Sequence, residues 1–430
     1  MRVFSKISQQ LLWRGLYLFS LFIINLLIAR ILGAEVSGNL NLLINNLSFW
    51  VLILGLSLET GIVYYSASKE IARSKLFTLI LGWSVLVLLA TWAMSGILSW
   101  ESSIPLQVFL IPLYSLSLVV ISQVSGIYQG MHNFKVHNAG LVAVNFILIA
   151  YLLFLLAYKI GDEHAPVRVM TAYLLSIVVQ ALVLLILATR AVQWRHLEVP
   201  SLVELKKIFR YSLLAWAANL IFFLVYRVDY WIIKYYRSDY ELGNYIQVSK
   251  LVQVFILIPG LVAAVIFPET AKDRSLRMRN HVMKASRIFA GGYFVFLILL
   301  TLVGKALFPL LYGETFNLMY LSFVLLIPGI LFLSVQNLLA AWFAGSNQTR
   351  YNLFGALIAI AVITILDFLL IPRYGIHGAA LTSSVGYFVY FFYQYKVFAG
   401  KEFLKATDLL LIKKEDISWL RSLFTKTSGA

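Results

Sequence analysis

The strongest constraint on this chain is a regular alternation of long apolar runs and short polar connectors along most of its 430 residues. Each run has roughly 18–25 residues, the length that crosses the hydrocarbon core of a bilayer at 1.5 Å rise per residue. Because backbone groups in lipid must be satisfied internally, the runs predict helices rather than the shorter, alternating strands of a barrel. The connectors are too short to fold into a soluble domain, so the function is expected to lie within the helices.

Composition supports a membrane protein. Hydrophobic residues make up 61% of the chain and charged residues only 13%, whereas soluble domains carry roughly 25% charged residues. The chain contains no cysteine, which excludes disulfides and thiolate metal sites.

The apolar runs form two sets of six. The fold expected from them is an all-α polytopic membrane protein, with about twelve transmembrane helices in two parallel six-helix lobes around a central cavity. Residues 1–205 are predicted to form the N-terminal lobe, 206–398 the C-terminal lobe, and 399–430 a basic amphipathic cytoplasmic tail. The predicted spans are 12–32, 40–64, 76–98, 105–128, 138–158 and 168–189, followed by 211–233, 244–267, 286–309, 318–343, 352–371 and 376–397.

The net charge of +16 is explained by topology. The most basic connectors, Lys69–Lys75, Arg190–Arg210 and Lys272–Arg287, all lie on one side of the predicted membrane. An excess of Lys and Arg marks the cytoplasmic side. We therefore expect both termini to be cytoplasmic, in the inner membrane of a bacterium, and we expect no nucleic-acid partner.

Weak matches between the two halves suggest an internal repeat. With six spans each, both halves enter the membrane from the same side, which predicts parallel repeats of the kind some transporters have. The matches are Gly38-Asn39 with Gly243-Asn244, Gly55 with Gly260, Gly130 with Gly345, Lys135 with Arg350, and Gly140 with Gly355.

Polar residues within the second span form the first candidate site. Asn41, Asn45, Ser48 and Glu59 fall on one face of a continuous helix. Such a stripe faces either a water-filled cavity or a polar neighbouring helix to which Asn and Ser donate hydrogen bonds. Both interpretations stay open for the Asn and Ser residues. For Glu59 we favour a coupling or counter-charge role, because a charge in mid-membrane costs at least about 2.5 kcal/mol.

Deep charges in other spans form the second candidate site. Arg227 and Asp229 lie two residues apart in the seventh span, so they point in different directions, and Lys250 lies in the eighth. Together with Arg30 they predict a cavity rich in cations, the natural partners of phosphates. Lys305 and Asp367 are expected nearer the membrane interface.

Signs of enzyme chemistry are lacking in the sequence. His132 and His137 have no nearby carboxylates and suit a solvated connector better than a metal site. Neither a phosphate-binding glycine loop nor a nucleophile elbow occurs. We expect no enzyme and no cofactor, with energy drawn from an H⁺ or Na⁺ gradient, the membrane potential or substrate flow.

Several motifs resemble one family. The segment from Arg30 to Gly38, RILGAEVSG, and the segment Leu56–Tyr64 around Glu59 resemble the first two spans of polysaccharide-export flippases. These are the Wzx-type members of the multidrug/oligosaccharidyl-lipid/polysaccharide (MOP) superfamily. The segments Asp229–Ile233, Gly243–Tyr245, Leu311–Phe316 and Ile371–Ala380 are similar to later parts of the same family. One departure is that Tyr64 and Tyr65 stand where the family often has an arginine.

The resemblance implies a flippase that moves an undecaprenyl-pyrophosphate-linked oligosaccharide from the cytoplasmic to the outer leaflet by alternating access. The product would serve the biosynthesis of O-antigen, capsule or exopolysaccharide. Arg30, Arg227 and Lys250 would contact phosphates or acidic sugars, and Glu59 and Asp229 would act as counter-charges or coupling sites. The partners would be the polyprenyl-linked glycan, the bilayer and glycan polymerase or assembly proteins.

Three alternatives remain, one of which is a binding or scaffold role for the glycan-assembly machinery. A multidrug or cation antiporter of the same superfamily would have a cavity dominated by carboxylates. A membrane glycan polymerase or ligase would form bonds between sugars.

Overall fold

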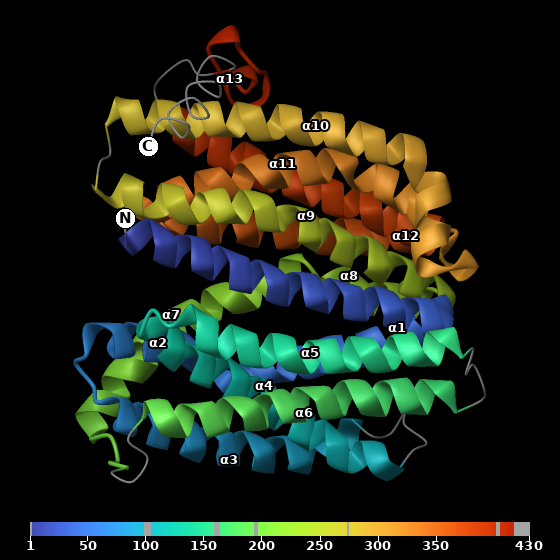
Figure 1. The fold of residues 1–430 in the computed structure, drawn as a ribbon. Coiled ribbons are helices and arrows are strands. Elements are labelled where there is room, and N and C mark those ends of the chain that lie inside the picture. The colour runs from blue at the N-terminus through green and yellow to red at the C-terminus, as the bar shows by residue number, and fades with distance from the viewer. Residues whose placement is uncertain are drawn as a thin grey trace. The chain divides into compact units, whose positions relative to one another are not determined.

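The computed structural model describes residues 2–98, 105–158, 164–192, 197–272, 275–400 and 405–416, and every regular element within them is helical (Figure 1). This confirms the prediction of an all-α protein. The elements are α1 Arg2–Gly55, α2 Leu58–Ser68, α3 Arg73–Leu98, α4 Pro105–Gly130, α5 Phe134–Ala157, α6 Ala165–Ala191, α7 Leu202–Val225, α8 Val228–Tyr236, α9 Asp239–Lys272, α10 Leu276–Tyr312, the 3₁₀ turn η3 Glu314–Phe316, α11 Met319–Gly345, α12 Arg350–Ala399 and α13 Thr407–Leu410.

The described residues contain ten helical stretches long and apolar enough to cross a membrane. Two of these stretches, Leu12–Gly55 and Arg350–Ala399, are far longer than one crossing needs. Each contains a glycine with non-helical backbone angles, Gly33 (φ 72°) and Gly375 (φ 59°). Glycine lacks the Cβ that makes positive φ costly, so these two positions allow the chain to change direction.

α12 is a helical hairpin that turns at Gly375. Its two halves pack antiparallel, and contacts join its first turn to its last turns. The Tyr390 hydroxyl donates to the Asn352 carbonyl (3.0 Å), and Gln394 Nε2 donates to Asn352 Oδ1 (2.8 Å). Nearer the turn, Gly386 lies against Ile363, and Gly378 lies against the backbone of Leu370.

The chain forms two compact units, Met1–Leu220 and Ile221–Ala430. In the first unit α4 is the central helix and packs against α1, α2, α3, α5 and α6. In the second unit α11 has this place and packs against α9, α10 and α12. α4 and α11 are the most buried of the ten apolar stretches, with 78% and 56% of their windows buried. They are the fourth and tenth predicted spans, so the same position is central in both halves.

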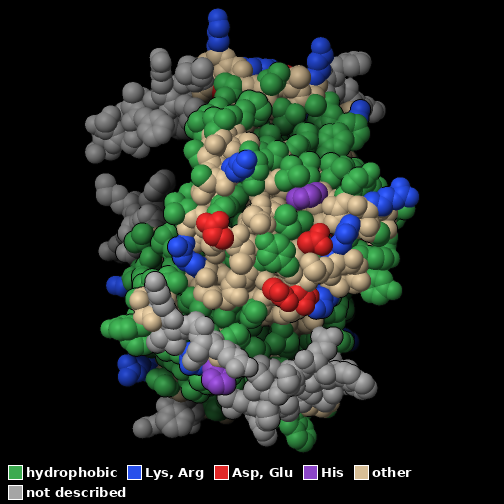
Figure 2. Space-filling model, turned by 90° about the vertical axis from the view of Figure 1, so that its right-hand side faces the viewer, with side chains coloured by type: hydrophobic (Ala, Val, Ile, Leu, Met, Phe, Trp, Pro, Cys, Tyr) green, Lys and Arg blue, Asp and Glu red, His purple; other side chains and the backbone are tan. Residues whose placement is uncertain are grey.

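Large apolar side chains cover the outside of the helices. Trp92, Ile147 and Leu302 are 62–75% exposed, while Asn145, Gln180 and Asp367 are fully buried. Figure 2 shows hydrophobic side chains over much of the surface and charged side chains in separate groups. This inside-out distribution is expected where lipid replaces water as the solvent. The protein is therefore a multi-pass membrane protein.

The described part of the C-terminal segment packs on α10. Leu409 of α13 is buried in the apolar cluster of the second unit, and Ile412 lies against Gly291. The buried Arg287 of α10 donates from Nε and Nη2 to the two carboxylate oxygens of Asp416, both at 2.6 Å. Residues 417–430, part of the predicted amphipathic tail, lie outside the described residues.

Candidate functional site

The second span is interrupted between α1 and α2. Leu56 (φ 47°) and Ser57 (φ 48°) both have left-handed backbone angles, which are uncommon for residues other than glycine. Because the helix ends at this turn, carbonyl groups in its last turn lack backbone N–H donors from the next turn. The indole N–H groups of two tryptophans donate hydrogen bonds to them instead. Trp216 Nε1 donates to the Leu52 carbonyl (3.0 Å), and Trp83 Nε1 donates to the Leu54 carbonyl (2.9 Å). Non-helical backbone at membrane depth is tolerated only where protein or a water-filled cavity surrounds it.

Close helix contacts hold this break in place within the first unit. The Ser57 hydroxyl accepts a hydrogen bond from Asn219 Nδ2 of α7 (3.0 Å). A Cβ on Gly61 would lie 2.6 Å from the Ser212 hydroxyl of α7. On the other side of α2, a Cβ on Gly126 of α4 would lie 3.1 Å from the Glu59 carbonyl. Small residues at both contacts let the helix backbones approach closely, as is common in membranes.

The break changes the predicted polar stripe. Asn41, Asn45 and Ser48 lie on α1, but Glu59 lies in the first turn of α2, beyond the left-handed turn. The prediction of one continuous face running to Glu59 is wrong, because the helical phase is lost at Leu56 and Ser57. Instead the half-buried Glu59 lies at a helix N-terminus, where the aligned backbone dipoles favour a negative charge.

The other members of the stripe are placed inside the first unit. Asn41 and Asn45 are buried, and neither amide atom of Asn45 has a hydrogen-bond partner among the described residues. The half-buried Ser48 donates to the Ile44 carbonyl of its own helix (2.7 Å). Arg30 lies exposed on α1, one turn before the bend at Gly33.

The seventh span is interrupted in a similar way, between α7 and α8. The turn falls at Tyr226 and Arg227, and Arg227 has a φ of −147°. Its guanidinium lies over the Phe223 ring, 4.6 Å from the ring centroid, a favourable cation–π geometry. Lys250 of α9 is half-buried and near enough for its charge to interact with that of Arg227. The structure thus brings together two of the three predicted cations.

Asp229 follows in the first turn of α8 and is fully buried. Its Oδ2 accepts hydrogen bonds from the Tyr245 hydroxyl of α9 and from the Ser383 hydroxyl of α12 (3.3 Å). Asp229 and Arg227 contact different side chains, Tyr245 of α9 and Phe223 of α7, although the helix whose periodicity predicted their different directions is broken at Arg227.

Asp367 is a further charged residue placed near this break. Expected near the membrane interface, it is fully buried within the protein, accepts a hydrogen bond from Thr382, and interacts electrostatically with Asp229. Asp229 Oδ1 and Asp367 Oδ2 have no hydrogen-bond partner among the described residues. Two neighbouring buried carboxylates are costly to keep charged without a proton or a cation.

The described residues contain no group of three or more His, Cys, Asp or Glu side chains that could hold a metal ion. Around the carboxylate pair, the Tyr245, Thr382 and Ser383 hydroxyls and the Ala379 carbonyl add further oxygen atoms. Hard monovalent cations and protons suit such an oxygen-rich group better than thiophilic metals do.

The described residues therefore define a multi-pass helical membrane protein with two broken helices, a cation pair and a buried carboxylate pair. The fold is similar to solved MOP-type transporters. One is the inward-facing form of a multidrug resistance MATE family transporter of the MOP superfamily, with a TM-score of 0.68 and 16% identity over 91% of this chain and 94% of that one. Another is the lipid II flippase MurJ in an inward closed conformation, with a TM-score of 0.71 and 13% identity over 99% and 93%.

Residues 15–272 match the family model described as "Polysaccharide biosynthesis protein". Because the match covers more than half of the chain, the protein belongs to this family, which confirms the resemblance found from its motifs. A curated relative is the capsular polysaccharide biosynthesis protein CapF of Staphylococcus aureus, 27% identical over 166 residues. That alignment spans 36% of this chain and 42% of CapF, so the chain matches less than half of the relative's length.

Proposed function

We propose that the protein is a flippase that moves a polyprenyl-pyrophosphate-linked oligosaccharide, with undecaprenol as the lipid, from the cytoplasmic to the outer leaflet for cell-surface polysaccharide. Membership of a polysaccharide biosynthesis family supports the choice of a glycan substrate. The similarity in fold to transporters supports a role in translocation rather than in bond formation.

The observation that carries the proposal is the pair of cations at the break in the seventh span. Arg227 and Lys250 are two basic side chains of successive apolar stretches, near enough for their charges to interact. A bound anion would stabilise the charged form of both. A pyrophosphate supplies two negative charges close together, and guanidinium groups bind it through paired hydrogen bonds.

The transport cycle that we propose uses twelve spans in two lobes, residues 1–205 and 206–398. Division of the two overlong stretches at Gly33 and Gly375 raises the ten stretches to twelve. Both termini would be cytoplasmic in the bacterial inner membrane. Rocking of the lobes about a central cavity would carry the head group across, while the polyprenyl chain stays in lipid. Arg30, with Asn41, Asn45 and Ser48, would contribute from the first lobe.

We assign coupling to the buried carboxylates. Asp229 and Asp367, with the hydroxyls that donate to them, would take up a proton or Na⁺. Cation binding would neutralise the pair and so bias the second unit between conformations that differ in affinity for the cation. Glu59, in the other unit, is the second candidate for coupling.

A leaflet-resolved assay tests the proposal. Purified protein is reconstituted with a short-chain fluorescent pyrophosphate-linked oligosaccharide, and the substrate that reaches the opposite leaflet is measured. We expect Arg227→Ala with Lys250→Ala to slow translocation by about tenfold or more, since two charge-assisted contacts are lost. The matched control is Lys305→Ala, which removes an exposed cation of α10.

The same preparation separates the alternatives. Normal translocation by the double variant would remove the cationic mechanism. Cation-driven uptake of a hydrophobic drug, with no movement of the glycolipid, would establish an antiporter. New sugar–sugar bonds formed by the purified protein would establish a polymerase or ligase.

A further inference from the structure

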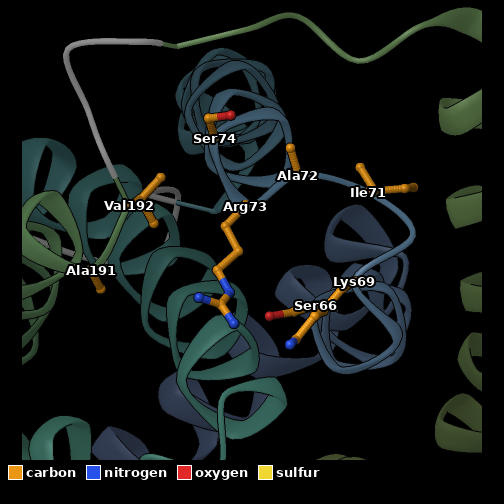
Figure 3. A pocket seen from close by; sticks show the side chains of 8 residues that line it. All are labelled: Ser66, Lys69, Ile71, Ala72, Arg73, Ser74, Ala191 and Val192. Atoms are coloured by element: carbon orange, nitrogen blue, oxygen red, sulfur yellow. The ribbon is translucent and has the colours of Figure 1, made fainter.

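A pocket of about 470 Å³ lies in the first unit, at the turn between α2 and α3 (Figure 3). Its volume is in the range of sites for small molecules or head groups. The lining residues are Ser66, Lys69, Ile71, Ala72, Arg73, Ser74, Ala191 and Val192, none of which carries a negative charge. None of them belongs to the cation pair, the carboxylate pair or the two helix breaks.

The two cations of this pocket point into one space. Figure 3 shows the Arg73 guanidinium and the Lys69 ammonium group directed toward the same region, with the Ser66 hydroxyl beside them. Lys69 is held with a left-handed φ of 59° where α2 ends, and Arg73 begins α3. A short, constrained turn therefore fixes the backbone of both residues.

Nearby carboxylates are already paired with other lysines. Glu70 lies 3.6 Å from Lys207, and Glu204 lies 3.0 Å from Lys75. The side chains of Lys69 and Arg73 have no hydrogen bond or ion pair with any described residue. The pocket thus combines two unneutralised positive charges with hydroxyl groups, a combination that suits a phosphate.

The position of the pocket favours a lipid as the source of the phosphate. The apolar stretch Arg73–Ala93 begins at the pocket, so Arg73 lies where a membrane helix enters the head-group layer. The apolar side chains of Ile71 and Val192 also line the pocket. A lipid can place its phosphate on the cations and keep its acyl chains in the adjacent leaflet.

We propose that this pocket binds the phosphomonoester head group of a membrane lipid, independently of the transport cycle. A phosphomonoester carries about −1.5 to −2 charges near pH 7, which two cations match better than they match the single charge of a phosphodiester. Binding would anchor the α2–α3 turn, and with it the short helix that carries Glu59, to the leaflet surface.

Binding of short-chain lipids to the purified full-length protein, reconstituted in phosphatidylcholine nanodiscs, tests the proposal. The probes are dioctanoyl phosphatidate, dioctanoyl phosphatidylglycerol and inorganic phosphate. The test variant is Lys69→Asn with Arg73→Gln, because asparagine tolerates left-handed backbone angles and preserves the turn. The matched control is Lys206→Gln with Arg210→Gln, which removes two exposed cations of α7 that do not line the pocket.

We expect saturable binding of phosphatidate, weaker binding of phosphatidylglycerol, and a loss of about tenfold or more in the test variant only, since charge-assisted contacts dominate the affinity. The single variants Lys69→Asn and Arg73→Gln should each give an intermediate loss, which guards against misfolding of the double variant. Equal losses in test and control variants would overturn the proposal, because general surface charge would then explain binding. Competition by inorganic phosphate at the same concentration as phosphatidate would also overturn it.

Discussion

Individual residues in this protein are informative where they break the apolar pattern. Arg227, Asp229 and Lys250 stand out in the sequence because charges inside a membrane span are costly and need a partner. The structure places all three near one helix break in the second unit. Their positions within apolar runs are visible in the sequence, whereas the side chains that surround them are not.

Asp367 shows why the neighbours could not be predicted. From the sequence it lies close to the end of an apolar run, where a carboxylate is expected to reach the interface. The hairpin at Gly375 instead folds Thr382 back onto it and brings it near Asp229. The spacing of polar and apolar residues along a helix does not show that the chain turns at Gly375 and packs the second half of α12 on the first.

Neutralising the carboxylate pair should uncouple transport. We expect Asp229→Asn with Asp367→Asn to retain glycolipid translocation down its own gradient. Acceleration by an imposed H⁺ or Na⁺ gradient should fall to the level seen without a gradient, because the amides cannot take up a cation by charge. The measurement is the leaflet-resolved assay with each gradient in turn. Glu314→Gln, an exposed acid of η3, is the control, and full acceleration of the double variant would show that the pair is structural.

Among the elements, the short helices α2 and α8 each follow a break in a predicted span. The sequence predicts the second and seventh spans as continuous, because Leu56, Ser57, Tyr226 and Arg227 are not helix breakers. The breaks arise from tertiary contacts, such as the tryptophan donors to the Leu52 and Leu54 carbonyls. Intrinsic propensity is a weak guide wherever tertiary contacts of this kind compete with it.

The contact between α2 and α4 depends on glycine. A Cβ on Gly130 would lie 2.6 Å from Ser66 Cβ and 2.9 Å from the Val63 carbonyl. We expect Gly130→Ala to destabilise the protein by about 1–3 kcal/mol, the usual cost of overpacking, as measured by thermal unfolding in detergent. Gly82→Ala on α3 is the matched control, because nothing lies within 4 Å of its Cβ, and it should be neutral or slightly stabilising. Equal melting temperatures for the two variants would contradict this packing.

Docking of the C-terminal segment on α10 should depend on pH and be lost in strong acid. Burial raises the pKa of Asp416, but hydrogen bonds from the Arg287 guanidinium and the Lys413 amide outweigh it, so the pKa falls below the ordinary value of 3.8. A carboxylate with a lowered pKa stabilises the folded state above its unfolded pKa. The stabilisation is therefore complete above about pH 4–5 and is lost as the pH falls through the lowered pKa.

A spin label at Lys414→Cys reports this docking. The label should be immobile at neutral pH and become mobile in strong acid. With Asp416→Asn it should be mobile already at pH 7, because breaking a buried ion pair costs about 3–5 kcal/mol. Glu415→Gln should have little effect, since Glu415 is exposed and its contact with Arg287 is longer (3.3 Å). An immobile label in Asp416→Asn would show that the apolar contacts alone hold the segment.

At the scale of the whole molecule, the two halves use glycine in the same way. Gly130 ends α4 and lies against α2, and Gly345 ends α11 and lies 2.5 Å, measured from its ideal Cβ, from the Phe267 carbonyl of α9. These glycines are one of the pairs found by comparing the two halves of the sequence. The weak repeat therefore corresponds to equivalent packing in the two units. The sequence shows the matched glycines in the same order in both halves. The structure shows that this pair allows a close helix contact in each unit.

Topology can be tested directly because the chain has no cysteine. Single variants Ser68→Cys and Ser238→Cys place a thiol at the exposed end of α2 and at the exposed turn before α9. From the distribution of basic connectors, a membrane-impermeant maleimide should label Ser68→Cys only from the cytoplasmic side and Ser238→Cys only from the outer side. Labelling of both from one side would refute the predicted crossing between them.

The boundary between the two units falls inside α7, between Leu220 and Ile221, and not in a connector. A gene split in two, or a chimera assembled from two relatives, therefore has no neutral junction. A cut in the segment 197–201 would remove from the first unit the helix that donates to Ser57 and packs on Gly61. A cut at the boundary itself would sever a helical ladder within the membrane. Exchange of halves between relatives should succeed only when α2 and α7 are taken from the same parent.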